Sequence, residues 1–267
     1  MNTRSQSYHG IKVLSLLKNL LKDTTLTQKR RVKDISKNEV VTEADIAAEN
    51  AVIGYIQKHN LHVNLDGEEK RRSTLTENPK GLWVLDPLDG TYNYFRGIFP
   101  YSSILSIFDS PKPKNLGSAV WAGIIDHSTG EILTTDQSPR TSGRKSLEGN
   151  VGDAEASVIV DLGPKQKIDA YLPYSEIIEN SWWRNASSAG FHFFGIATGR
   201  LDAFLCPIQK PEELVAGIPL IEKAGGSIIT YDGKRAGDLS YDFNKKYQII
   251  AASTKELAYE IKEKLRL

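Results

Sequence analysis

Two aspartates stand three residues apart at the point where a short apolar run ends. Residues 82–85 predict a buried strand, and Asp86 and Asp89 follow it, with Pro-Leu between them and a Gly-Thr turn after them. Carboxylates at the end of a buried strand lose hydration, so they need a positively charged partner. A divalent cation with oxygen ligands meets that need. The segment therefore predicts metal-assisted phosphate chemistry.

Three further acidic residues are candidates for the same site. Asp45 and Glu213 each lie in the first turn of an expected helix, and Glu68 lies in a Gly-Glu-Glu segment after an apolar stretch. Each has an ordinary explanation when taken alone, because first-turn acids complement the helix dipole and such segments form exposed turns. Together with Asp86 and Asp89 they form an oxygen-rich set, which suits magnesium better than zinc.

The turn after Asp89 has the residue types of a phosphate-binding segment. Gly90 allows the chain to bend closely around a ligand. The amide groups of Gly90 and Thr91 would then face a phosphate at the start of a short helix. The Leu88 carbonyl can point toward the same centre.

Helical and strand patterns alternate along the chain and must position these residues. Helices are expected at 8–22, 43–59 with Thr42 as the N-cap, 168–178, 188–198, from Pro211 to Gly225-Gly226, and after a capping box at 253–256. Strands are expected at 82–85, 102–108, 118–126, 131–135, 156–162, 181–185, 201–205, 227–231 and 247–252. Residues 126–130 predict a hairpin turn. The pattern predicts an α/β (α+β) fold, in which mixed sheets pack between layers of helices.

Composition limits the classes of partner and compartment. The chain has 267 residues with 34 Lys+Arg against 33 Asp+Glu, so no basic field argues for nucleic acid. A single cysteine, Cys206, excludes an internal disulfide and indicates a reducing compartment. No apolar run is long enough for a membrane span, and the N-terminus is unlike a signal peptide. We expect a cytoplasmic protein with no nucleic-acid or membrane partner.

Two polar stretches are expected to be connections. Residues 137–154 are rich in Ser, Gly and Arg, and they indicate a boundary between subdomains at 1–150 and 151–267. The first would carry the metal-binding motif and the second would complete the site. The basic run at 29–33 is typical of a solvated loop.

Several segments together resemble the inositol monophosphatase family, which belongs to a superfamily with fructose-1,6-bisphosphatase and 3′-phosphoadenosine phosphatases. Residues 83–91, WVLDPLDGT, are similar to its signature. Further matches, in the family's order, are VTEAD at 41–45, GEE at 67–69, ATGRLD at 197–202 and the helix at 215–226. The resemblance implies a layered αβαβα fold, a homodimer and inhibition by lithium.

The resemblance also implies the metal ligands. Glu68, Asp86 and the Leu88 carbonyl would hold a first magnesium ion. Asp86 would bridge to a second ion, held also by Asp89 and Glu213. The family normally has a Trp-Asp pair where this chain has Glu212-Glu213, so the last ligand would be a longer carboxylate.

The remaining implied roles concern water, phosphate and substrate. Thr91, hydrogen-bonded to Asp45, would orient the attacking water. The amides of Gly90 and Thr91 would hold phosphate oxygens. Ser187 and Ser188 would line the substrate pocket.

A second departure concerns the substrate. Inositol-specific relatives carry a Glu that binds the sugar-alcohol hydroxyls, and this chain has Cys206 there. A thiol does not replace a carboxylate in binding a diol. We therefore expect magnesium-dependent hydrolysis of a small phosphate monoester by a metal-activated water. The substrate would be an inositol phosphate, fructose 1,6-bisphosphate, or a related sugar or nucleotide phosphate. The alternative is a degenerate member that binds a phosphorylated ligand or a partner without turnover.

Other conspicuous residues have structural explanations. His192 lies among phenylalanines on an expected helix, which favours a core or interface histidine over a metal ligand. Trp182 and Trp183 are typical of packing or a dimer contact, because no basic groove accompanies them.

Overall fold

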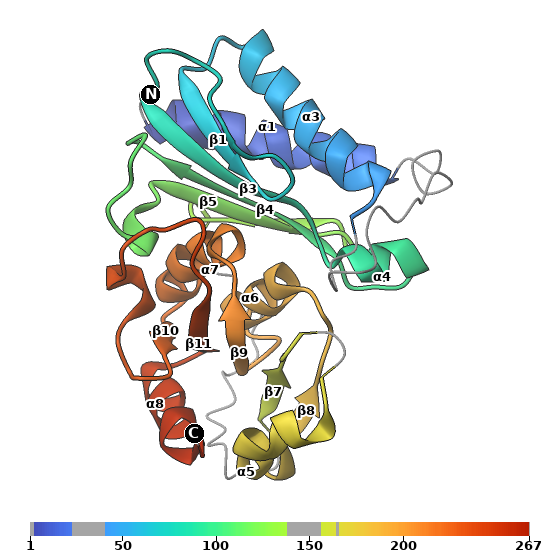
Figure 1. Ribbon diagram of the computed structural model, residues 1–267, viewed down its shortest axis with the longest axis vertical. Helices are drawn as coiled ribbons and strands as arrows, with labels where there is room; N and C mark the ends of the chain where they lie inside the picture. Colours follow the sequence, from blue (N-terminus) through green and yellow to red (C-terminus); the bar gives the residue numbers. More distant parts are fainter. Residues whose placement is uncertain (1–2, 23–40, 138–155, 164–165, 267) are drawn as a thin grey trace.

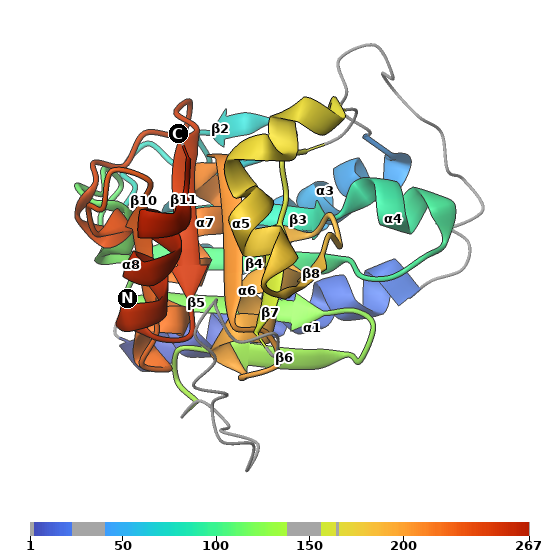
Figure 2. The same cartoon turned by 90° about the horizontal axis from the view of Figure 1, so that it is seen from below.

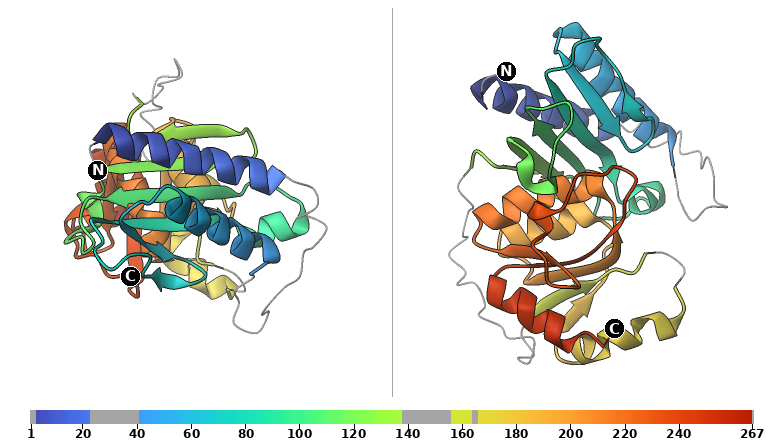
Figure 3. Two further views of the ribbon diagram at one scale, coloured as in Figure 1. Left: turned by 90° about the horizontal axis from the view of Figure 1, so that it is seen from above. Right: turned by 60° about the vertical axis from the view of Figure 1, so that its left-hand side comes forward.

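Five layers of alternating helices and sheets build the molecule (Figure 1). A computed structural model describes residues 3–22, 41–137, 156–163 and 166–266. The outer helices on one side are α1 (Thr3–Lys22) and α3 (Glu43–Lys58), which lie side by side across the first sheet (Figure 3). Helices α6 (Ala189–Ala197) and α7 (Pro211–Lys223) lie between the two sheets. Helices α5 (Ser175–Glu179) and α8 (Lys255–Lys264) cover the far face of the second sheet (Figure 2). The predicted αβαβα layering is confirmed.

The first sheet has six strands in the order β2-β1-β3-β4-β5-β6. Their bounds are β1 Val63–Gly67, β2 Arg71–Ser73, β3 Gly81–Asp89, β4 Ser102–Phe108, β5 Trp121–Asp126 and β6 Glu131–Thr134. Strand β3 is buried along its whole length and pairs in parallel with β1 and antiparallel with β4. This central strand delivers Asp86 and Asp89 to the site.

The second sheet has five strands in the order β10-β11-β9-β7-β8. Their bounds are β7 Ser157–Val160, β8 Trp182–Arg184, β9 Ala203–Gln209, β10 Ser227–Thr230 and β11 Tyr247–Ala252. Strand β9 leads through a single residue into α7, so it sets where the first turn of that helix lies.

Several element boundaries differ from those expected. Strand β3 continues to Asp89 instead of ending at residue 85. The strand expected at 118–126 begins at Trp121, after a 3₁₀ turn at Leu116–Ser118. The two short strands β1 and β2 were not predicted. Strand β1 does alternate apolar Val63 and Leu65 with polar neighbours, but over only five residues, and β2 has three residues, too few to show a period.

Two helix predictions also need correction. The helix expected at 168–178 is a 3₁₀ turn, Ile168–Tyr174, followed by the short α5, because Pro173 has no amide hydrogen for an α-helical bond. The C-terminal helix is capped by Thr254, whose side chain accepts from the Leu257 amide at 3.1 Å, and not by Ser253. Short elements complete the chain: α4 (Thr91–Arg96) and a 3₁₀ turn at Ala236–Asp238.

Three apolar cores hold the layers together. One lies on the outer face of each sheet, and the middle core surrounds α6 and α7 between the two sheets. The middle core joins first-sheet residues such as Leu82 and Ile104 to Phe193, Leu214 and Ile249 of the second half. The two halves of the chain therefore share one core. The predicted boundary at 150/151 and the basic run at 29–33 lie outside the described residues. Among the helices that the structure describes, none has the length and apolar character needed to cross a membrane.

Candidate metal and phosphate site

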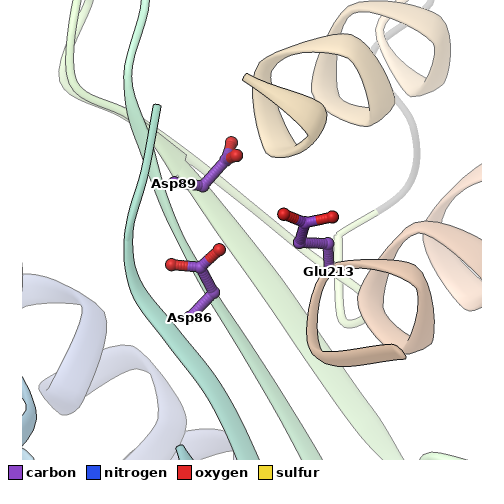
Figure 4. Close-up of side chains that lie close together, drawn as sticks. All are labelled: Asp86, Asp89 and Glu213. Atoms are coloured by element: carbon purple, nitrogen blue, oxygen red, sulfur yellow. The ribbon is translucent and has the colours of Figure 1, made fainter. Parts of the chain in front are cut away.

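Asp86, Asp89 and Glu213 bring their carboxylates together at one end of the first sheet. One oxygen atom from each of the three lies within 4.8 Å of the others (Figure 4). Glu213 enters from the first turn of α7, which Pro211 begins at a position where a missing amide hydrogen does no harm. We call these three residues the carboxylate cluster.

A β-bulge explains how two aspartates of one strand reach the same centre. Residues i and i+3 of a regular strand point to opposite faces. Asp86 pairs with Ile104 and Asp89 with Ser102, so the interval is three residues on β3 and two on β4. The extra residue on β3 rotates the strand, and both side chains then point toward Glu213 (Figure 4).

The cluster is electrostatically unfavourable without a cation. Burial raises the pKa of Asp86 well above its ordinary value, and the charges of Glu68 and Asp89 add to the shift. Burial likewise raises the pKa of Glu213, although Lys210 acts in the opposite direction. Three oxygen donors of this kind fit a hard divalent cation such as magnesium. Such an ion would remove the repulsion that raises these pKa values.

Asp89 also accepts four hydrogen bonds from neutral groups. The hydroxyls of Ser102 and Ser188 donate to its Oδ2 at 2.6 and 2.5 Å. The amides of Ala189 and Gly190 donate to Oδ1 and Oδ2 at 3.1 and 2.8 Å. Asp89 thus lies on the N-terminus of α6, with Ser188 as the N-cap of that helix. Burial raises its pKa, while these hydrogen bonds act against the increase.

Thr91 and Asp45 are in direct contact beside the cluster. The Thr91 hydroxyl lies 2.9 Å from Asp45 Oδ1 and 2.9 Å from the Leu88 carbonyl oxygen. Asp45 is held by Thr42, the N-cap of α3, whose amide and hydroxyl donate to its Oδ2 at 2.7 and 2.5 Å. Burial raises the pKa of Asp45 to about 6, although the bonds from Thr42 and Thr91 oppose this. The Asp45 carboxylate thus accepts the Thr91 hydroxyl hydrogen while its pKa is shifted toward neutral pH.

Glu68 does not join the carboxylate cluster. It follows β1 in a turn that Glu49 holds in place, because the Glu69 and Lys70 amides donate to the Glu49 carboxylate at 3.0 and 3.1 Å. Its own Oε1 forms an ion pair with Lys210 Nζ at 2.5 Å. Burial lowers the pKa of Lys210, but the surrounding carboxylates outweigh it and raise that pKa well above its ordinary value.

Gly90 lies beneath the loop that carries the two predicted substrate serines. Its φ of 83° is in the left-handed region, and an added Cβ would lie 3.1 Å from the Ser188 Cβ. A side chain there is therefore both strained and crowded. Asn93 fixes this arrangement by donating to the carbonyl oxygens of Pro100 and Ala186 at 2.7 and 2.8 Å. Ser187, with a φ of 53°, is exposed and donates to Asn185.

The sequence-predicted residues fall into three groups. Asp86, Asp89 and Glu213 converge, and Thr91 contacts Asp45 and the Leu88 carbonyl. Ser188 reaches Asp89, whereas Ser187 faces solvent. Glu68 is paired with a lysine instead of joining the cluster.

Sequence reasoning missed Lys210 and Ser102. Lys210 stands immediately before Pro211, so the helix start at Pro211 was a signal that its side chain would emerge beside Glu213. Ser102 opens the strand that pairs with β3, but its contact depends on the bulge. Cys206 is buried, and burial raises the pKa of its thiol, so it presents a neutral group.

Comparisons with known proteins agree with this fold. The model of the inositol monophosphatase family matches residues 8–266. Nus factor SuhB of Pseudomonas aeruginosa is 29% identical over 239 residues, covering 84% of this chain and 82% of that protein. A fructose-1,6-bisphosphatase/inositol-1-monophosphatase of Archaeoglobus fulgidus is 28% identical over 237 residues, covering 85% and 86%.

A solved structure extends the likeness in fold. The extragenic suppressor protein SuhB from Bartonella henselae superimposes with a TM-score of 0.80 at 20% identity, covering 98% of each chain. Relatives therefore carry two kinds of name, one of a phosphatase and one of a Nus factor. The expected absence of a nucleic-acid partner stays a prediction.

Proposed function

The chain belongs to the inositol monophosphatase family, and we propose that it is a magnesium-dependent phosphatase that hydrolyses a small phosphate monoester. The observation that carries this proposal is the convergence of Asp86, Asp89 and Glu213 from two elements far apart in the sequence. Carboxylates with raised pKa values cluster at functional sites, and three convergent carboxylate oxygens are the ligands that a hard divalent cation prefers.

The carboxylate cluster would hold the cation. A divalent ion bound there supplies positive charge that stabilises the phosphoryl group during its transfer. Ser102 and Ser188 orient Asp89 by donating to its carboxylate. Glu213 is positioned by Gln209, whose side-chain amide donates to it from the end of β9.

Thr91 and Asp45 would handle the attacking water. The Thr91 hydroxyl accepts a hydrogen bond from the water and donates its own hydrogen to Asp45 Oδ1, 2.9 Å away. A threonine hydroxyl is a weak base, so its contribution is orientation, and Asp45 takes the proton. The first amides of α4, at Gly90 and Thr91, would donate to phosphate oxygens.

Phosphate release tests the proposal directly. Inositol 1-phosphate, fructose 1,6-bisphosphate and 3′-phosphoadenosine 5′-phosphate should be assayed with and without magnesium. We expect magnesium-dependent turnover of at least one of them. Glu213→Gln should lower it by at least about 100-fold, because a cation ligand is lost.

A matched control lies on the same helix. Glu222, in the last turns of α7, pairs with Arg235 far from the cluster, so Glu222→Gln should keep wild-type turnover. The enzyme assignment would be contradicted if the wild-type protein released phosphate from none of the small esters.

A second candidate is a binding role without turnover. It is favoured by relatives that carry the name Nus factor SuhB, and by the Glu212-Glu213 pair where the family has Trp-Asp. The position of Glu213 supports the enzyme instead, because its carboxylate faces Asp86 and Asp89 (Figure 4). A wild-type protein that binds phosphate esters without hydrolysing them would favour this candidate.

A further inference from the structure

Lys210 places a positive charge inside the acidic site. It is the N-cap residue of α7, and its Nζ lies 2.5 Å from Glu68 Oε1. The side chains of both partners are mostly covered, with 28% of Lys210 and 23% of Glu68 exposed. An ion pair so poorly hydrated is screened little by solvent, so it is stronger than a pair on an open surface.

Both partners of this pair are positioned by the backbone around them. Lys210 directly precedes Pro211, whose ring fixes the start of α7, and its ammonium lies close enough to Glu213 for the two charges to interact. Glu68 lies in the turn that Glu49 holds through the Glu69 and Lys70 amides. The contact therefore joins two restrained segments that lie 142 residues apart in the sequence.

We propose that the Lys210 ammonium takes the place of one metal ion, so that this chain binds a single divalent cation, at Asp86, Asp89 and Glu213. The inference rests on the proposed function only in taking the carboxylate cluster as the cation site. It departs from the arrangement that the family resemblance implied, in which Glu68 and Asp86 hold an ion of their own.

The partners of the acidic residues distinguish the two positions. The hydrogen bonds to Asp89 come from hydroxyl and amide groups, which leave its negative charge in place. Glu68 instead faces a full positive charge at ion-pair distance. A divalent ion at Glu68 would have to displace this tethered ammonium or lie beside it against like-charge repulsion. The same ammonium also acts electrostatically on Glu213, but among the described residues the ion pair that it forms is with Glu68.

The cation stoichiometry tests the proposal on the full-length protein. Manganese, which native mass spectrometry and calorimetry both count, is the probe. We expect one tightly bound ion per wild-type chain. Lys210→Met keeps the aliphatic stem and removes the charge, so Glu68 becomes available and the count should rise to two. Lys223→Met removes a lysine from the other end of α7 and should leave the count at one.

Two outcomes would overturn the inference: a wild-type count of two, or an unchanged count of one in Lys210→Met. Should Lys210→Met fail to fold, Glu68→Gln provides the test on its own. The wild-type count of one should persist in Glu68→Gln, and loss of that ion would show that Glu68 is a ligand.

Phosphate release from the same samples separates this inference from the proposed function. Two ions with turnover would overturn the role of Lys210 and leave the phosphatase assignment standing. One ion without turnover would contradict the phosphatase assignment and leave the role of Lys210 standing.

Discussion

The Ser188 hydroxyl donates to Asp89 Oδ2 at 2.5 Å, and Ser188 is also the N-cap of α6. One carboxylate of the candidate cation site therefore also fastens the end of β3 to a helix of the second half. The amides of Ala189 and Gly190 complete this contact. Asp89 and its neighbour in the cluster, Asp86, consequently have different effects on the stability of the metal-free protein.

Asp89→Ala should destabilise the fold. The change removes the acceptor of two hydroxyl and two amide donors in a buried place. Leaving buried donors unsatisfied costs about 1–3 kcal/mol each, so the free energy of unfolding should fall by about 3 kcal/mol or more. Urea unfolding without added metal measures this. An unfolding free energy within 1 kcal/mol of wild type would contradict the fastening role.

Asp86→Asn should have the opposite effect on the metal-free fold. A raised carboxyl pKa means that the folded state holds its proton to higher pH than the unfolded state, so wild-type stability falls as pH rises through the folded pKa. Asparagine removes this loss, and the variant should therefore be the more stable protein at pH 8. Thermal unfolding across pH 5–8 measures the difference.

The same Asp86→Asn variant should lose both magnesium-dependent stabilisation and phosphatase turnover. Asp109→Asn is the control, because Asp109 is exposed beyond the opposite end of β4. Wild-type turnover in Asp86→Asn would show that the cluster is not the catalytic cation site.

Thr91→Val should slow turnover without changing cation binding. Valine has nearly the shape of threonine but has no hydroxyl for Asp45 or for water. The expected fall in kcat is about 100-fold or more, which is the usual contribution of a positioned proton-transfer group. Thr91→Ser keeps the hydroxyl and should retain most of the activity. Equal activity in the valine and serine variants would remove Thr91 from the mechanism.

His192→Phe should stabilise the protein, most of all in mild acid. The ring of His192 is fully buried against Phe204, and neither nitrogen has a hydrogen-bond partner among the described residues. Burial lowers its pKa to about 3 from 6.5. The unfolded state therefore binds a proton first as pH falls below 6.5, and wild-type stability decreases there.

The size of this effect follows from the shift. Between pH 6.5 and 5 the loss from this residue is about 2 kcal/mol, and the phenylalanine variant should escape it. Urea unfolding of both proteins at pH 7 and at pH 5 measures how much of its free energy of unfolding each protein loses between these pH values. A variant that loses as much stability as wild type over this interval would show that His192 is not the group responsible.

The family and the layered fold could be predicted because they depend on local segments. The signature at residues 83–91 and the matches at 41–45 and 67–69 are runs of consecutive residues. Each can therefore be recognised without knowing which distant residues it contacts. The start of α7 was also predictable, since Pro211 marks it locally.

The parts that escaped prediction depend on distant partners. The bulge between Asp86 and Asp89 exists only in the pairing of β3 with β4. Pro87, which has no amide hydrogen for the ladder of a central strand, was a local signal of it that was not used. The ion pair of Glu68 with Lys210 joins positions 142 residues apart. The turn at Ile168–Tyr174 was mistaken for an α-helix because apolar spacing does not separate the two helix types within so few residues.

The shared middle core has a consequence for synthesis on the ribosome. Strands β3 and β4 emerge long before α6 and α7, which cover their inner face. Until those helices are made, the nascent chain exposes Leu82 and Ile104 and carries Asp86 and Asp89 without Glu213 or Lys210. The candidate cation site is thus completed late in translation. A chain released before α7 would have an exposed apolar sheet face and no assembled carboxylate cluster.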